Sequence, residues 1–189
     1  TVLLSTGRTP HTQGLGLEAA GVRLNGRAIA VDSHLQTSVP GVYAIGDCIG
    51  GQMLAHVASY EAEVAVDNIM GEPREVDYRV VPNCIFTMPE IASVGMTEEQ
   101  AREQGLHFTV SRFPFSVCGR ALALGETEGQ VRISSEAEPQ GKGRILGVHS
   151  MGPHASDLIA EAALAMQLNA SAYDIARTIH AHPTLPEAL

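Results

Sequence analysis

The pattern of hydrophobic and polar positions along this 189-residue chain changes near residue 69. In the first part the apolar runs are short and are interrupted by Gly and Pro, which is typical of buried strands joined by turns. We expect strands at 2–4 and 29–31, the end of a short helix at 18–22, a turn and a strand at 37–46, and an Ala-rich helix at 53–70. Gly71 and Pro73 are expected to end that helix. Residues 1–68 are therefore expected to form one region.

Beyond residue 69, strand-like runs come first and helical patterns follow. We expect strands at 83–87, 91–96, 107–113, 129–134 and 143–150, and helices at 154–168 and 171–179. Thr97, with Gln100 three residues later, predicts a further helix start, because each side chain can cap a backbone N–H group of the other. Residues 134–143 are expected to form a surface loop. Strands followed by helices favour an α+β fold, in which residues 69–189 form an antiparallel sheet with flanking helices.

Composition and charge exclude several classes of protein. A net charge of −9, with no stripe of Lys or Arg, argues against nucleic acid as a partner. No apolar run approaches the roughly 18–20 residues of a membrane span, so no membrane partner is expected. Cys48, Cys84 and Cys118 are an odd and widely spaced set, which favours reduced thiols and a cytoplasmic location. No metal site is expected.

The two ends of the chain suggest a piece of a larger enzyme. The start has no initiator Met and no basic segment before a long apolar core, so it resembles an interior strand rather than a signal peptide. The chain also stops two residues after a catalytic-looking element.

That element lies in the last ten residues, where His182 and Glu187 are five positions apart around a proline-stiffened turn. A histidine can exchange a proton near neutral pH, since an unperturbed imidazole titrates at about 6.5. A glutamate beside it can fix the tautomer and stabilise the charged form. Residues 180–187 therefore contain the parts of an oriented general base.

A second candidate region lies in the first half of the chain. Asp47 follows an apolar strand, where its carboxylate can accept hydrogen bonds from sugar or ribityl hydroxyls. A carboxylate that only ends a turn or caps a helix is the alternative. Residues 53–56 begin a helix whose first N–H groups can face an electron-rich ligand. Alternatively, Met53 and Leu54 are core residues and His56 is a surface histidine.

Taken together, these stretches resemble the flavoprotein disulfide reductases, and within them most closely the dihydrolipoamide dehydrogenases. The resemblance is carried by TSVPGVYAIGD at 37–47, MLAH at 53–56 and HAHPTLPE at 180–187, with further agreement at 5–10, 86–95 and 113–115. The motifs occur in the order found in that family and span essentially the whole chain. Pro186 departs from the Ser or Thr more often found there, which leaves His182 and Glu187 in place.

The resemblance implies the role of each candidate residue. Asp47 would bind the ribityl chain of FAD, and Met53, Leu54, Ala55 and His56 would line the flavin through their backbone. Gly7 would lie near bound NAD. His182 would be the proton acceptor and donor for a dithiol, oriented by Glu187. His180 falls outside the His-Pro-Thr-x-x-Glu pattern, and a structural or supporting role is expected for it.

The same resemblance implies the domains and partners. Residues 1–68 would hold the end of the NAD-binding domain and the central, FAD-contacting α/β region, and residues 69–189 a C-terminal dimerisation domain. We expect a homodimer whose subunits complete each other's sites. The implied activity is oxidation of protein-bound dihydrolipoamide with NAD⁺ as acceptor, on the lipoyl domain of a 2-oxoacid dehydrogenase complex or of the glycine cleavage system.

Two parts of that family's machinery are absent from the chain, and two alternatives stay open. The chain contains neither a Gly-x-Gly-x-x-Gly turn nor a Cys-x-x-x-x-Cys pair. We therefore expect the chain alone to be inactive and to bind neither FAD nor NAD. The first alternative is another flavin disulfide reductase, of the glutathione or mercuric reductase type. The second is a stand-alone, non-enzymatic dimerisation module.

Overall fold

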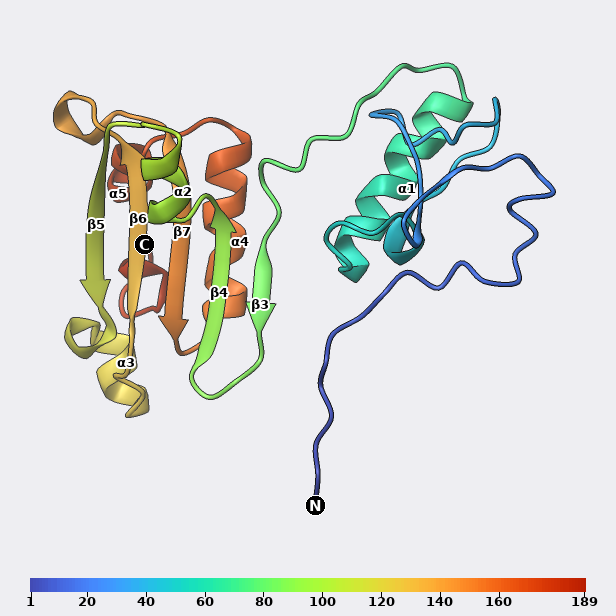
Figure 1. The fold of residues 1–189 in the computed structure, drawn as a ribbon. Helices are drawn as coiled ribbons and strands as arrows, with labels where there is room; N and C mark the ends of the chain where they lie inside the picture. The colour runs from blue at the N-terminus through green and yellow to red at the C-terminus, as the bar shows by residue number, and fades with distance from the viewer. The chain divides into compact units, whose positions relative to one another are not determined.

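The computed structural model describes residues 1–189, apart from the side chain of Gln140. The chain divides into two compact units, Thr1–Asp77 and Tyr78–Leu189, called unit 1 and unit 2 below. Each unit has its own cluster of buried hydrophobic side chains. Figure 1 shows their elements, with unit 1 built around α1 and unit 2 around a sheet.

Unit 1 has little regular structure besides one helix. β1 (Leu24–Asn25) and β2 (Ala28–Ile29) form a short antiparallel hairpin. A 3-10 helix spans Gly46–Ile49, and α1 spans Ala55–Ile69. The core consists of the buried Leu35, Val64 and Ala65 with the partly buried Val31, Tyr43, Ile45, Ile49, Tyr60 and Val76. The loops of unit 1 therefore pack against α1, whose expected position at 53–70 is confirmed.

The strand expected at 2–4 is wrong. Val2, Leu3 and Leu4 are 87%, 87% and 84% exposed. Among the described residues they pair with no strand. A strand needs a neighbour to satisfy its backbone N–H and C=O groups, and an apolar run does not by itself provide one.

The helix end expected at 18–22 is also wrong. The segment is a run of turns, in which the Val22 N–H donates to the Leu17 carbonyl. Gly16 and Gly21 flank this run with positive φ angles, a backbone conformation that does not continue a right-handed helix. The strands expected at 29–31 and 37–46 are shorter than predicted: beyond β2, single bridges join Val31 to Thr37 and Gln36 to Tyr43.

Unit 1 extends past the end of α1. The Asn68 side chain donates to the Arg74 carbonyl at 2.7 Å and accepts from the Arg74 N–H at 3.1 Å. The Arg74 guanidinium contacts the Asp67 carboxylate at 2.7 Å. Further along, the Val76 N–H donates to the Ser33 carbonyl. The expected boundary at 68/69 therefore coincides with the end of α1, while the segment that follows packs back onto unit 1 as far as Asp77.

Unit 2 is built on a five-stranded antiparallel sheet with strand order β3-β4-β7-β6-β5. The strands are β3 (Asn83–Ile85), β4 (Glu90–Gly95), β5 (Phe108–Pro114), β6 (Gln130–Glu136) and β7 (Ile145–Gly152). The helices are α2 (Glu98–Glu103), α3 (Gly119–Leu124), α4 (Ala155–Gln167) and α5 (Ala172–Arg177). Short 3-10 helices span Phe115–Val117, Pro139–Gly141 and Pro186–Ala188. The antiparallel sheet with flanking helices expected from the sequence is confirmed.

The two faces of this sheet differ in chemistry. One face is apolar and packs against α4 (Figure 1), through the buried residues Ala92, Val94, Val131, Ile133 and Val148 of the sheet and Leu158, Ile159 and Ala162 of the helix. On the other face the register aligns Arg112, Arg132 and His149 in one row. There the Arg132 side chain pairs with Glu98 at the start of α2. The alternation of side chains along each strand therefore separates a core face from a polar face.

Two features of unit 2 differ from expectation. β6 continues to Glu136, so the loop expected at 134–143 begins later. β6 pairs with β5 up to Glu136 and with β7 through a register shift at Ser134/Ser135, and the Glu136 carboxylate binds the Arg144 guanidinium at 2.6 Å. The short helix α3 was not expected, because its N-cap residue, Cys118, makes no side-chain cap bond and gives no helix-start signal like that of Thr97.

The expected capping box is present at the start of α2: Thr97 accepts from the Gln100 N–H at 3.1 Å, and Gln100 accepts from the Thr97 N–H at 2.9 Å. In the part of the chain that the structure describes, no helix combines the length and the apolar character that crossing a membrane requires.

Candidate active site

The C-terminal turn of unit 2 is fixed to the core by apolar side chains. After α5 the chain runs through residues 178–185 and ends in the 3-10 helix Pro186–Ala188. Leu185 and Ala188 are 8% and 2% exposed and belong to the main core of unit 2. The Cys118 thiol, also in that core, donates to the Thr184 carbonyl at 3.6 Å. The polar groups of this turn are therefore carried by a well-anchored backbone.

His182 and Glu187 meet within this turn. His182 Nδ1 lies 2.8 Å from Glu187 Oε1, and the other carboxylate oxygen, Oε2, accepts from the Thr184 N–H at 2.8 Å. These two bonds hold the carboxylate in one orientation. They also lower the pKa of Glu187 below its usual value, first through the Thr184 N–H and then through His182. Glu187 is therefore an ionised acceptor that favours a proton on His182 Nδ1.

The His182 ring is open to solvent. Its side chain is 76% exposed, against 29% for Glu187. Gly119, at the start of α3, lies beside the ring, since a Cβ there would come within 3.8 Å of His182 Cε1. Among the described residues no hydrogen bond engages Nε2, the second ring nitrogen. With Nδ1 oriented by the carboxylate, Nε2 is the atom through which this histidine can exchange a proton with an external group.

His180 belongs to a different pair. Its Nε2 lies 2.8 Å from Glu161 Oε1 on α4, and its Nδ1 lies 3.0 Å from the Thr178 carbonyl oxygen. Its side chain is only 16% exposed. The Glu161 carboxylate is the main reason that the pKa of His180 is raised, with burial acting in the opposite direction. Sequence reasoning did not find Glu161, because a residue 19 positions away on another element gives no local spacing signal.

The candidate flavin-binding residues lie together in unit 1. Asp47 is in the 3-10 helix that packs against α1, and its carboxylate is half exposed and contacts the Arg8 guanidinium at 3.3 Å. Next to it, the Gly46 N–H donates to the buried Glu61 carboxylate at 2.6 Å. A Cβ at Gly46 would come within 3.2 Å of the Ala58 side chain, in the first turns of α1. The structure therefore brings Asp47 to the start of α1.

The start of α1 has no side-chain cap. Leu54 is the N-cap residue and has no polar side-chain atom to cap the helix, while Ala55 and His56 are exposed. The N–H groups of a first helical turn have no intrahelical acceptor, so a helix start of this kind can face an electron-rich group. Gly7 lies in the N-terminal segment, outside any helix or strand, with φ of +92°.

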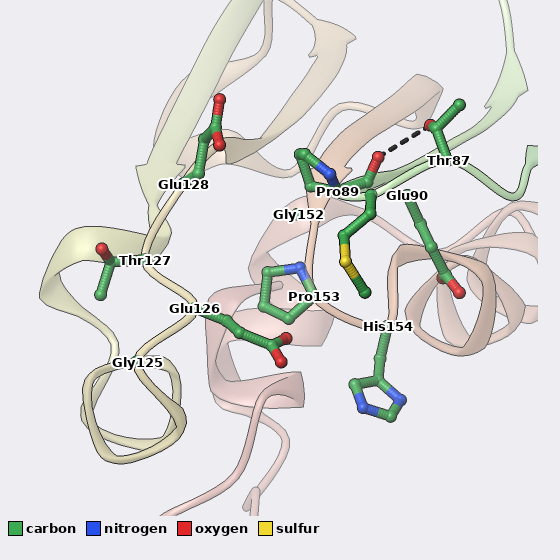
Figure 2. Close-up of a pocket in the computed structure, with 11 residues that line it drawn as sticks. Thr87, Pro89, Glu90, Gly125, Glu126, Thr127, Glu128, Gly152, Pro153 and His154 are labelled. Carbon is green, nitrogen blue, oxygen red and sulfur yellow. Dashed lines mark hydrogen bonds between the residues drawn. The ribbon is translucent and has the colours of Figure 1, made fainter.

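One pocket of unit 2 is lined by neither His182 nor Glu187. It has a volume of about 580 Å³ and is lined by residues of three segments, 87–90, 125–128 and 152–154. Figure 2 shows the Thr87 hydroxyl bonded to the Pro89 carbonyl among these lining residues. The Glu90 carboxylate there accepts from the N–H and hydroxyl of Ser156. Both of these bonds are made to Oε2. His154, another lining residue, lies 3.1 Å through Nδ1 from Asp157 Oδ2.

Comparison with known proteins places both units in one family. Residues 81–189 match the model of the pyridine nucleotide-disulphide oxidoreductase dimerisation domain, and residues 1–62 match the model of the pyridine nucleotide-disulphide oxidoreductases. The chain therefore belongs to the pyridine nucleotide-disulphide oxidoreductase family.

Within this family the chain is similar to dihydrolipoyl dehydrogenases. It is 48% identical to that of Bacillus subtilis over 98% of this chain and 39% of the relative, and 50% identical to the mitochondrial one of Pisum sativum over 100% and 37%. Its structure is similar to the HOCl-induced flavoprotein disulfide reductase RclA of Escherichia coli, with a TM-score of 0.88, 30% identity, and 97% of this chain and 42% of that chain covered. The chain thus spans about two fifths of the length of the relatives it matches.

Proposed function

We propose that this chain is part of a dihydrolipoyl dehydrogenase, in which His182 and Glu187 form the acid–base pair that handles the protons of a dithiol. The observation that carries the proposal is the bond from His182 Nδ1 to a Glu187 carboxylate whose second oxygen is held by the Thr184 N–H. The 48–50% identity to dihydrolipoyl dehydrogenases over essentially the whole chain supports this substrate class.

The chemistry requires a base of this kind. Oxidation of a dithiol to a disulfide releases two electrons and two protons, and the sulfur reacts as a thiolate. His182 Nε2 would accept the proton of one thiol, and Glu187 would stabilise the imidazolium that forms. The imidazolium would then release this proton to solvent through the same exposed nitrogen. The second proton would leave with the two electrons, since NAD⁺ takes up two electrons and one proton when it is reduced. Because the carboxylate is already oriented, this step needs no rearrangement of the turn.

The residues of unit 1 fit a flavin. FAD, when bound, would supply the two-electron acceptor for the dithiol. The half-exposed Asp47 carboxylate would accept hydrogen bonds from ribityl hydroxyls, and the backbone of Met53, Leu54, Ala55 and His56 would line the ring. Gly7 would lie near NAD. We expect the chain alone to bind neither cofactor.

We further propose that the protein is a homodimer through unit 2. The match of residues 81–189 to a dimerisation domain supports this, and so do the exposed apolar side chains of Leu164 and Leu168 at the C-terminal end of α4. The protein partner would be a lipoyl domain of a 2-oxoacid dehydrogenase complex or of the glycine cleavage system. The free thiols of Cys48, Cys84 and Cys118 favour the cytoplasm as its compartment.

The test is the His182→Gln variant of the complete gene product. We expect dihydrolipoamide oxidation to fall roughly 10²- to 10⁴-fold, the range for loss of a general base, while flavin absorbance stays. His154→Gln is the matched control, since His154 is another exposed histidine of unit 2 beside a carboxylate, Asp157 at 3.1 Å, and should keep normal turnover. Near-normal turnover of His182→Gln would overturn the assignment. A wild-type enzyme that reduces glutathione disulfide or Hg²⁺ instead of oxidising dihydrolipoamide would favour the other flavin disulfide reductases.

A further inference from the structure

The His180 ring has hydrogen-bond acceptors at both of its nitrogens. Nε2 faces the Glu161 carboxylate at 2.8 Å, and Nδ1 faces the Thr178 carbonyl oxygen at 3.0 Å. A carbonyl oxygen can only accept, and so can an ionised carboxylate. A neutral imidazole carries one N–H group, so it can satisfy only one of these acceptors. Both bonds form together when both nitrogens are protonated and the ring carries a positive charge.

The charges around His180 favour this form. Glu161 faces the ring from α4, and Glu187 lies close enough in the turn to raise the pKa of His180 further. Arg112, on β5, is a cation that lines the same hollow as His180 and Glu187. The ring is mostly buried, which opposes the charge, but the Glu161 bond outweighs burial in setting the direction of the pKa.

The position of this pair suggests what it does. Glu161 lies on α4, whose neighbouring residues Leu158, Ile159 and Ala162 are buried against the sheet. His180 is two residues before His182, so its bond to Glu161 fixes the start of the turn to a rigid helix. Leu185 and Ala188 fix the end of the same turn to the core. The segment that carries His182 and Glu187 is thereby held at both ends.

We propose that His180 is a positioning residue: as a permanently charged imidazolium clamped between Glu161 and the Thr178 carbonyl, it holds the 181–187 turn so that His182 and Glu187 keep their geometry. The expected effect on turnover rests on the proposed function, whereas the protonation state of the His180 ring does not depend on it. Of the two histidines in the motif, His182 is then the one that titrates during the reaction, and His180 keeps its protons throughout.

The first test measures the protonation state of the His180 ring directly and needs no substrate. In ¹⁵N-histidine-labelled protein, both nitrogens of His180 should show protonated shifts at about pH 7, where an unperturbed imidazole is mostly neutral. In Glu161→Gln the amide can still accept a hydrogen bond but carries no charge, so the His180 titration should move to lower pH. A wild-type His180 that titrates like a free histidine would overturn the proposal, even if the enzyme proved fully active.

The second test measures turnover in the complete gene product. We expect Glu161→Gln to lower kcat for dihydrolipoamide roughly tenfold through misplacement of the pair, with the KM for NAD⁺ unchanged and the pH profile of kcat shifted. Asp157→Asn, four positions earlier on α4, removes the carboxylate of the exposed His154 pair and should leave kcat and the profile unchanged. A Glu161→Gln enzyme with normal kcat and a normal profile would refute the positioning role. An inactive wild type would instead refute the proposed function and leave the ¹⁵N result standing.

Discussion

Unit 1 and unit 2 are stabilised by different kinds of interaction. In unit 2 a five-stranded ladder and a single large apolar core account for most of the contacts, with α4 covering one face of the sheet. In unit 1 the core is small, and the loops are tied down by side chains that bind backbone groups. Examples are Asp32, which accepts from two N–H groups of the following turn, Asn68, which binds three carbonyls, and Glu61, which accepts from the Gly46 N–H.

This difference shows which interactions hold the residues of each proposed role in place. The His182–Glu187 turn is anchored by burial of Leu185 and Ala188, so its position follows from packing of the core. Asp47 is held indirectly, through the Gly46–Glu61 bond and the contact of Gly46 with α1. Apolar substitutions should therefore damage unit 2 most, and polar substitutions unit 1.

The largest effect is expected from Phe115→Ala in unit 2. Phe115 is fully buried, and its ring contacts the backbone at Gly152, where an added Cβ would come within 2.2 Å of it. Removing the ring should cost about 3–5 kcal/mol of unfolding free energy, measured by denaturant unfolding of unit 2. Phe86→Ala is the matched control, since Phe86 is 80% exposed, and should change stability by less than about 0.5 kcal/mol. Equal losses of unfolding free energy in the two variants would contradict the conclusion that one apolar core stabilises unit 2.

A smaller effect is expected from Glu61→Ala in unit 1. The variant leaves the Gly46 N–H without its carboxylate, and such a loss typically costs about 1–3 kcal/mol. Faster hydrogen exchange confined to unit 1, together with weaker flavin retention in the complete gene product, would report it. Glu63→Ala, on the same helix but exposed, should change neither. If both variants behaved alike, hydrogen bonding would not be what orders this part of unit 1.

The smallest effect concerns the pH dependence of the C-terminal turn. The Thr184 N–H and His182 lower the pKa of Glu187, so its stabilising contribution is present above the unfolded-state pKa and is lost as pH falls through the folded-state pKa. In a ¹³C carboxyl titration Glu187 should titrate at lower pH than in Thr184→Pro, a variant that lacks the N–H donor. A Glu187 midpoint at or above its usual value would contradict the geometry of the turn.

The same difference explains what the sequence could predict. In unit 2 alternating apolar positions must face one core, so the strands at 91–96, 107–113 and 129–134 were placed within about two residues. In unit 1 the order depends on side-chain-to-backbone bonds such as those of Asn68 and Asp32, which leave no periodic signal. The strand predicted at 2–4 is wrong for a related reason, because an apolar run does not show whether another strand pairs with it.

The candidate site was partly predictable. The spacing of His182 and Glu187 within one turn gave their pairing, since five residues around two prolines leave few arrangements. The partner of His180 did not follow from the sequence, because Glu161 reaches it only through the packing of α4 under the turn. Local spacing thus predicted the contact between His182 and Glu187, and only the tertiary structure showed that Glu161 contacts His180.

The way the chain stays with unit 1 beyond α1 has a practical consequence for dividing the molecule. An expression boundary placed after residue 69 would remove Arg74, whose carbonyl binds the Asn68 side chain, and Val76, which packs against the core of unit 1. The Asn68 side chain and that core would then be exposed to solvent. A boundary after Asp77 keeps those interactions and leaves all the strands of unit 2 intact. The junction at 77/78 is therefore the place to introduce a protease site or a fusion partner when each half is to be produced on its own.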